Sequence, residues 1–302
     1  MRGDSKQYKG KGGLVKIAYF GDDFFINCFY MLRKFGHEIA YVFVCAEEGY
    51  GDKLLALANA ENIPIRFDKV EAGFVDKIIC EEKIDCVFSA GYGWKIQFDY
   101  DAVMSLNIHP TMLPLGRGPD AAAWVTLKYR EGAGVTFHKL NGTFDAGDIL
   151  CQRSILLEEQ DGWELYMAKV QIEVAWALPE LLENFSELYE KAISQELGVN
   201  WPPATIAERL IDWDMTQDKI RTITKAFGRW GVITMVGDTY LLINDLELSI
   251  FSHRFPAGKP LSEDRYAFTI ATKEGLAFLA KKNILRTLDV TEVRNLGLSI
   301  GH

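Results

Sequence analysis

Short apolar segments alternate with stretches of helical periodicity over the first half of the chain. The apolar segments predict strands at residues 14–20, 38–45, 64–67 and 84–89. The stretches between them predict helices at residues 24–36, 53–62 and 72–83. Strands that alternate with helices indicate a mostly parallel sheet with helices on both faces, which predicts a Rossmann-like α/β domain.

The pattern changes in the second half. A long helical pattern over residues 163–189 predicts a helix that closes the α/β domain, and the paired prolines within residues 198–205 predict an extended linker. A short helix is predicted near residues 217–227. Strands are then predicted at residues 232–236, 240–243, 267–271 and 275–280. Short strands separated by turn residues indicate a small β-rich, barrel-like domain.

These patterns divide the 302 residues into four parts. Residues 1–13 are polar and glycine-rich and predict a disordered leader, residues 14–197 an α/β domain, residues 198–209 a linker, and residues 210–302 a smaller β-rich domain. The leader lacks the apolar centre of a secretory signal, and no apolar run approaches the length that crosses a bilayer. We therefore expect a cytoplasmic protein without membrane contact.

Composition and charge exclude several classes. The five cysteines are odd in number and scattered, with no CxxC pair, so we expect no disulfide framework and no metal site. The net charge of -9 opposes attraction to polyanions, because nucleic-acid binders usually carry a basic face. Binding of nucleic acid is therefore not expected.

The loop after the first predicted strand reads Gly21-Asp22-Asp23-Phe24. It does not form the GxGxxG pattern that holds a dinucleotide, and two aspartates would repel a pyrophosphate. A nicotinamide cofactor is therefore disfavoured. Ligands of parallel sheets bind beyond the carboxyl ends of the strands, so the loops after residues 20, 45, 89 and 109 are where chemistry is expected.

Two polar side chains share one face of a strand in residues 106–114, LNIHPTMLP. Residues two apart on a strand point the same way, so Asn107 and His109 converge while Ile108 packs inward. Taken alone, this motif also fits a histidine with satisfied hydrogen bonds at a strand end, beside an asparagine that caps a turn.

A second segment carries Asp145 in a glycine-punctuated loop, which alone fits an ordinary turn. The two segments together, LNIHPTMLPLGRG and GVTFHKLNGTFDAGDIL, resemble the catalytic signature of the 10-formyltetrahydrofolate-dependent formyltransferases. That family includes methionyl-tRNA formyltransferase, glycinamide ribonucleotide formyltransferase and the sugar N-formyltransferases. The resemblance extends over about residues 14–230 and identifies residues 14–197 as the catalytic domain.

The resemblance implies a role for each of the three residues. His109 is expected to be the acid/base, Asn107 the donor that stabilises the oxyanion, and Asp145 the carboxylate that orients the histidine. The chemistry agrees, because a histidine transfers protons near neutral pH and an amide N–H stabilises a developing oxyanion. The formyl donor implied is 10-formyltetrahydrofolate.

Residues 87–96, VFSAGYGWKI, resemble the pterin-binding loop of the family. The expected contacts to folate come from Ala90, Gly91, Tyr92 and Gly93, together with Asp145. Small residues let the backbone approach a ligand closely. Without the resemblance, the segment fits an ordinary turn after a strand.

The residues expected to contact the amine substrate are Asp22, Asp23 and Arg117. Contact by the two aspartates is implied by the family alone. Arg117 lies between glycines, where a guanidinium can pair with a phosphate or carboxylate, although a solvated loop arginine fits as well.

The acceptor is expected to be an amine on a small molecule. Methionyl-tRNA formyltransferase carries a long basic loop where this chain has residues 45–53, CAEEGYGDK, which are short and net acidic. Residues 201–302 hold thirteen Lys/Arg against twelve Asp/Glu, which is not a basic surface. Nucleotide-linked amino sugars are therefore favoured, followed by hydroxyornithine-type or carrier-bound amino acids.

Three alternatives remain open at this point: a methionyl-tRNA formyltransferase, a 10-formyltetrahydrofolate hydrolase in which water replaces the amine, and a folate-binding module without activity. Measuring folate release with and without an amine separates the last two from a transferase. A homodimer is compatible with the sequence.

Overall fold

The computed structural model describes residues 15–45, 50–67, 69–195 and 197–295. The chain divides into two compact units. The first takes Met1–Arg117, Gly132–Leu156 and Lys169–Asn200, and the second takes Gly118–Glu131, Leu157–Ala168 and Trp201–His302. The predicted leader, residues 1–13, lies outside the described residues. The domain boundaries taken from the sequence remain a prediction.

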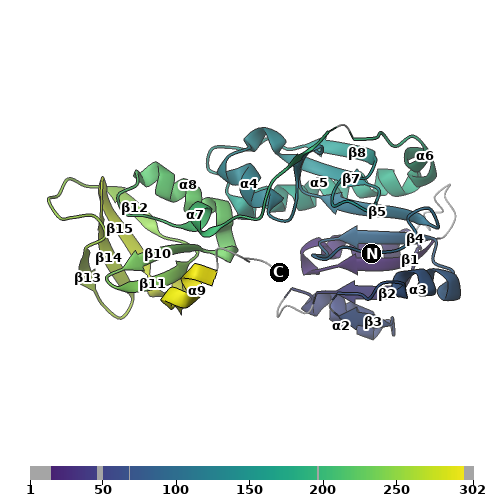
Figure 1. Cartoon of the computed structure of the whole chain (residues 1–302), viewed down its shortest axis with the longest axis horizontal. Helices are drawn as coiled ribbons and strands as arrows, with labels where there is room; N and C mark the ends of the chain where they lie inside the picture. Colours follow the sequence, from purple (N-terminus) through teal and green to yellow (C-terminus); the bar gives the residue numbers. More distant parts are fainter. Residues whose placement is uncertain (1–14, 46–49, 68, 196, 296–302) are drawn as a thin grey trace, which may run out of the picture. The chain divides into compact units, whose positions relative to one another are not determined.

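A seven-stranded sheet in the order β3-β2-β1-β4-β5-β7-β8 forms the centre of the first unit (Figure 1). Its strands are β1 (Lys16–Gly21), β2 (Glu38–Val44), β3 (Ile65–Phe67), β4 (Cys86–Ala90), β5 (Met104–His109), β7 (Gly134–His138) and β8 (Ile149–Ser154). Neighbours among β1 to β5 pair in parallel, while β7 pairs antiparallel with β5 and with β8. The predicted mostly parallel α/β fold is confirmed.

Helices and two short strands complete the first unit. The helices are η1 (Asp23–Phe25), α1 (Ile26–Lys34), α2 (Asp52–Ala60), α3 (Phe74–Glu82), the later part of α5 (Trp163–Glu183) and α6 (Phe185–Glu190). The strands β6 (Leu115–Arg117) and β9 (Val199–Asn200) pair in parallel. All five residues of β4 are buried, as expected for a central strand covered on both faces, and Phe20 stacks on Phe43 with ring centroids 4.0 Å apart.

One predicted helix is interrupted. Residues 163–189 were expected to form a single helix, but the structure divides them into α5 and α6 at Asn184. The Asn184 side-chain amide donates to the carbonyl oxygen of Glu180 at 2.9 Å. Such a local bond to the backbone competes with continuation of the helix, which is why asparagine is found at helix ends.

The second unit is rich in short strands. One sheet has the order β10-β11-β16 and the other β12-β15-β14-β13. The elements are α4 (Ala121–Leu127), η2 (Arg130–Gly132) up to Glu131, the first part of α5, α7 (Ile206–Arg209), α8 (Gln217–Phe227), η3 (Gly228–Trp230), β10 (Val232–Val236), β11 (Thr239–Ile243), β12 (Glu247–Ile250), β13 (Pro260–Glu263), β14 (Ala267–Thr272), β15 (Gly275–Ala280), η4 (Lys281–Asn283), β16 (Ile284–Leu288) and α9 (Val290–Asn295). The four predicted strands correspond to β10, β11, β14 and β15, and the predicted β-rich character is confirmed.

Among the described residues, none of the helices combines the length and the apolar composition that a membrane crossing requires.

Candidate active site

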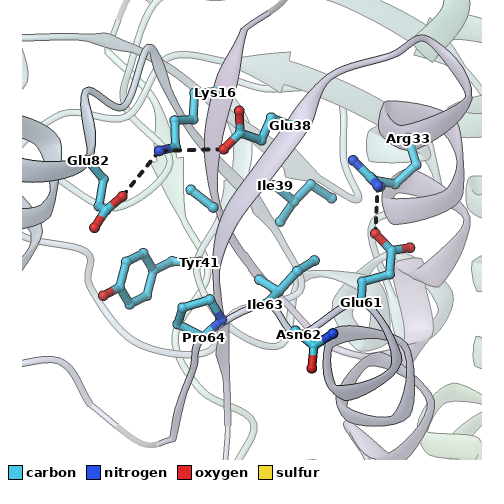
Figure 2. A pocket seen from close by; sticks show the side chains of 11 residues that line it. Lys16, Arg33, Glu38, Ile39, Tyr41, Glu61, Asn62, Ile63, Pro64 and Glu82 are labelled. Carbon is cyan, nitrogen blue, oxygen red and sulfur yellow. Dashed lines mark hydrogen bonds and ion pairs between the residues drawn. The ribbon is translucent and has the colours of Figure 1, made fainter.

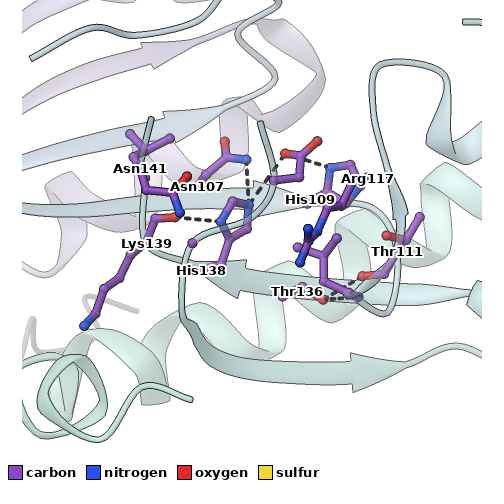
Figure 3. A network of polar contacts seen from close by, with 12 residues as sticks. Asn107, His109, Thr111, Arg117, Thr136, His138, Lys139 and Asn141 are labelled. Carbon is purple, nitrogen blue, oxygen red and sulfur yellow. Dashed lines mark hydrogen bonds and ion pairs between the residues drawn. The ribbon is translucent and has the colours of Figure 1, made fainter. Parts of the chain in front are cut away.

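Two neighbouring antiparallel strands bring the polar residues of the site together. Asn107 and His109 lie on β5, Asn107 pairs in register with His138 on β7, and Asp145 follows in the loop between β7 and β8. One carboxylate oxygen of Asp145, Oδ1, lies 3.4 Å from His109 Nδ1 and 3.7 Å from His138 Nε2. Figure 3 shows Asn107, His109 and His138 in this network. The three residues expected from the sequence therefore meet, and a second histidine joins them.

The hydrogen bonds of His138 determine its tautomer. Its Nδ1 lies 2.7 Å from the carbonyl oxygen of Lys139, which can only accept, so Nδ1 carries the hydrogen. Nε2 then accepts from the Nδ2 group of Asn107 at 3.0 Å. Burial of the fully enclosed ring lowers the pKa of His138 from 6.5 to about 4, although the nearby Asp145 carboxylate opposes the shift. His138 is therefore neutral near pH 7.

This neutral histidine sets the orientation of the Asn107 amide. Because Nε2 of His138 accepts, the Asn107 end that faces it must be the NH2 group. The planar NH2 group has a second N–H, which points away from the imidazole. Asn107 therefore presents a donor of known orientation at the site.

His109 has the opposite arrangement. Its Nε2 lies 2.7 Å from the carbonyl oxygen of Gly116, so Nε2 carries a hydrogen, and its Nδ1 faces the Asp145 carboxylate. Nδ1 and Oδ1 can both accept a proton, and a proton taken up by either atom lies between the two. The His109–Asp145 pair can therefore hold a proton and pass it on, while His109 is buried and Asp145 only slightly exposed.

Asp145 has an unusual backbone conformation. Its φ is 52°, in the left-handed region that non-glycine residues seldom adopt and that costs about 1 kcal/mol or more. Gln195 donates from Nε2 to the carbonyl oxygens of Asp145 and Gly147 at 2.9 and 2.6 Å. Arg117 donates from Nε and Nη2 to Gln195 Oε1 at 3.1 and 2.8 Å, and its expected contact with substrate remains a prediction.

The two aspartates after β1 bind backbone amides. Asp22 accepts from two amides of η1 at 3.0 and 3.4 Å, and Asp23 accepts from two amides at the start of α2 at 2.9 and 2.8 Å. Burial raises the pKa of Asp22 from 3.8 to about 7. These contacts are those of helix caps. Substrate contact by Asp22 and Asp23 remains a prediction without support from this geometry.

The loop expected to bind folate lies beside the catalytic strand. Ala90 ends β4 and is in register with Ile108 of β5. Gly91 has a φ of 87°, and a Cβ added there would lie 2.5 Å from Asp22 Oδ1, so this position requires glycine. Tyr92 packs edge-on against a buried phenylalanine, and the Gly93 amide donates to Cys45 Sγ at 3.4 Å. Folate contact by these residues remains a prediction.

A lysine connects this loop to the one that carries Asp145. Lys95 Nζ donates to the carbonyl oxygen of Gly142 at 2.5 Å. This bond joins the loop after β4 to the loop after β7, and these two strands are the neighbours of β5 in the sheet.

Two cavities of the first unit lie apart from the four site residues. One of about 520 Å³ borders the start of β5 and is lined by residues that include Met104, Leu140, Asp148 and Tyr189. The other, of about 320 Å³, lies at the amino-terminal end of β2 (Figure 2). Ion pairs surround that second cavity, with Lys16 between Glu38 and Glu82 at 3.4 and 3.1 Å and Arg33 on Glu61 at 2.7 Å. It lies at the end of the sheet opposite to the one where parallel sheets bind ligands.

Within the described part of the chain, no group of three or more His, Cys, Asp or Glu side chains is arranged to hold a metal ion.

The sequence interpretation missed His138 and Gln195. His138 lies within the segment GVTFHKLNGTFDAGDIL, where no pattern marks it as a site residue. Placing residues 134–138 on a strand antiparallel to residues 104–109 would have set it beside Asn107, because paired residues share a face of the sheet. For Gln195, which lies in an irregular segment 50 residues after Asp145, no sequence pattern indicates the contact.

Comparison with known proteins matches part of the chain to one family. The model of the formyl transferase domain matches residues 75–182, which include all four site residues. Methionyl-tRNA formyltransferase of Coprothermobacter proteolyticus is 25% identical over 273 residues, covering 86% of this chain and 89% of that protein.

Solved structures share the fold. HypX from Aquifex aeolicus in complex with tetrahydrofolic acid has a TM-score of 0.70 at 19% identity, over 94% of this chain and 47% of HypX. This chain thus spans about half the length of HypX. An N-formyltransferase from Helicobacter canadensis in complex with folinic acid and dTDP-3-aminofucose has a TM-score of 0.62 at 15% identity, over 89% of this chain and 99% of that one. The matched domain and these relatives support a formyltransferase family for the chain, whose residues 75–182 match the formyl transferase domain.

Proposed function

We propose that this protein transfers the formyl group of 10-formyltetrahydrofolate to a primary amine at Asn107, His109 and Asp145. The observation that carries the proposal is the meeting of an amide donor, an imidazole and a carboxylate beside β5, within the range that matches the formyl transferase domain. The support for folate as donor is its presence, as tetrahydrofolic or folinic acid, in the two structural neighbours.

The amine nitrogen attacks the formyl carbon, and a C–N bond forms while the carbonyl oxygen becomes an oxyanion. Asn107 donates its second Nδ2–H to that oxygen, since the first is held by the neutral His138. Removal of one such donor typically costs about 3 to 4 kcal/mol of barrier. A preoriented donor is effective because no reorganisation is needed as the charge develops.

The amine must lose a proton as the bond forms. The His109–Asp145 pair accepts it at Nδ1 or Oδ1, the two atoms that face one another at 3.4 Å. The tetrahedral intermediate then collapses, the bond between the formyl carbon and folate N10 breaks, and N10 takes up a proton. The products are a formamide and tetrahydrofolate, so atoms and charge balance.

We propose a nucleotide-linked amino sugar as the acceptor. Two observations support this choice: the acidic residues 45–53 where a tRNA-binding loop would be basic, and the likeness to an N-formyltransferase bound to dTDP-3-aminofucose over nearly all of that chain. Arg117 receives no support as the residue that binds the anionic part of the acceptor, because its guanidinium bonds to Gln195.

Methionyl-tRNA is a second candidate acceptor. The observation in its favour is the alignment with a methionyl-tRNA formyltransferase over 86% of this chain, through both compact units. The acidic net charge of -9 weighs against it.

A panel assay decides among the acceptors. The purified protein is incubated with 10-formyltetrahydrofolate and, in separate reactions, dTDP-linked and GDP-linked amino sugars, hydroxyornithine, free amino acids and methionyl-tRNA, and the products are read by mass spectrometry. We expect formylation of at least one nucleotide-linked sugar. Formylation of methionyl-tRNA alone would replace the sugar proposal, and folate release at one rate regardless of amine would indicate a hydrolase.

A further inference from the structure

Three consecutive residues after α6 hold the loop that carries Asp145. Ile193 and Ile149 exchange backbone hydrogen bonds of 2.8 and 2.9 Å, which places residues 193–195 alongside this loop. Ser194 Oγ donates to Asp148 Oδ1 at 3.0 Å. Gln195 contributes the two bonds to the carbonyl oxygens of Asp145 and Gly147.

The amide of Gln195 is oriented by Arg117. A guanidinium only donates, so the end of the amide that it contacts is Oε1, and the Nε2 group must then face the loop. A side chain at Gly198 would clash with the Arg117 guanidinium, so the chain packs closely on that side. Arg117 thus determines which groups Gln195 presents to the loop.

The two bonds from Gln195 act beside a residue with a left-handed backbone conformation. They hold the carbonyl groups of Asp145 and Gly147, the first of which comes directly after the Asp145 Cα. The φ of Asp145 is 52°, and its carboxylate must stay near His109 Nδ1. Strained residues persist when their surroundings hold them, and a displacement of about 1 Å at a reacting group can cost about 100-fold in rate. A side chain that holds the carbonyl of Asp145 also limits where its carboxylate can lie.

We propose that Gln195, oriented by Arg117, is a positioning residue that holds the Asp145 carboxylate at His109 during formyl transfer. Arg117 acts through Gln195. The proposal rests on the proposed function for its effect on rate, while the holding of the loop is a property of the protein alone.

The kinetic test uses Gln195→Glu, which keeps the size of the side chain and an oxygen for Arg117 but removes both donors to the loop. We expect kcat to fall about 10- to 100-fold, with KM for folate and for the amine changed less than about threefold. Ser194→Ala is the matched control, because it removes a neighbouring bond to the same loop and leaves Gln195 in place. It is expected to retain kcat within about threefold.

Arg117 is tested by a double-mutant cycle. If Arg117 acts through Gln195, then Arg117→Ala lowers kcat. The kcat of the double variant Arg117→Ala/Gln195→Ala then lies within about twofold of the kcat of Gln195→Ala. Independent, multiplying effects would overturn the proposal. So would Arg117→Ala with wild-type kcat and a raised KM for the amine, which is the result for a residue that binds substrate.

A readout without activity separates this proposal from the proposed function. Hydrogen exchange of residues 143–149 is compared in the wild type, Gln195→Glu and Ser194→Ala, each shown to be folded by circular dichroism. Loss of two hydrogen bonds predicts exchange about tenfold faster or more in Gln195→Glu, with a smaller change in the control. Unchanged exchange would overturn the proposal even with a changed rate, whereas a wild type that formylates no amine would overturn only the proposed function.

Discussion

The buried, neutral His138 predicts a specific loss of stability in acid. Its pKa in the folded protein is about 4, below the ordinary 6.5 expected for the unfolded chain. Between these two values the unfolded chain takes up a proton that the folded protein does not. His138 therefore contributes stability that is present above pH 6.5 and is lost as the pH falls toward 4.

The size of the loss follows from the two pKa values. Each pH unit between them corresponds to about 1.4 kcal/mol, so lowering the pH from 7.5 to 4.5 should destabilise the folded protein by about 2.5 kcal/mol through this one group. His138→Gln places a side chain there that is neutral at both pH values. It removes this pH-dependent contribution while other titrating groups stay the same.

Urea unfolding followed by circular dichroism measures the effect. The free energy of unfolding is determined at pH 7.5 and 4.5 for the wild type and His138→Gln. The wild type should lose about 2.5 kcal/mol more than the variant between the two pH values. Equal losses would show that His138 is charged or solvated in the folded protein, and the assigned tautomer and the orientation of Asn107 would then be wrong.

Three further predictions concern the site and its support. His109→Ala should abolish formyl transfer with little change in the midpoint of thermal unfolding, and wild-type turnover by a pure preparation would refute the proton-transfer role. Asn107→Ala should lower kcat about 100- to 1,000-fold in steady-state assays, and a change confined to KM would refute the oxyanion role. Asp22, with a pKa raised from 3.8 to about 7, favours the folded state most below pH 4 and least above pH 7. The free energy of unfolding of Asp22→Asn minus that of the wild type should therefore rise by up to about 4 kcal/mol from pH 4 to pH 8 in urea unfolding. A difference that stays constant with pH would contradict the buried carboxyl.

The parallel strands could be predicted because buried strands are continuous apolar runs. The segment LVKIAYF has this pattern, and its residues 16–20 lie in β1, whose last five residues are buried. The strands β12, β13 and β16 could not be predicted in the same way. Most of their residues are exposed, so their sequences carry little of the apolar pattern that marks a strand.

The candidate site could be predicted in part. Asn107, His109 and Asp145 were found because they lie in two motifs with fixed spacing, and the structure brings them together. The partners of Arg117 could not be found, because Gln195 is 78 residues away and meets it only through the fold. A charged residue between glycines looks the same in sequence whether it binds a ligand or another side chain.

The interleaving of the two compact units has a consequence for how such a protein can be recombined. Segments Gly118–Glu131 and Leu157–Ala168 belong to the unit whose main body begins at Trp201. Within that unit α4 packs against α8, with Thr126 Oγ1 3.3 Å from the carbonyl oxygen of Ala226. A protein ending after residue 200 would keep α4 without α8 and expose its buried alanines to solvent. A chimera with a single junction after residue 200 takes α4 from one parent protein and α8 from the other. Such chimeras should aggregate unless the residues of α4 that pack against α8 are exchanged as well.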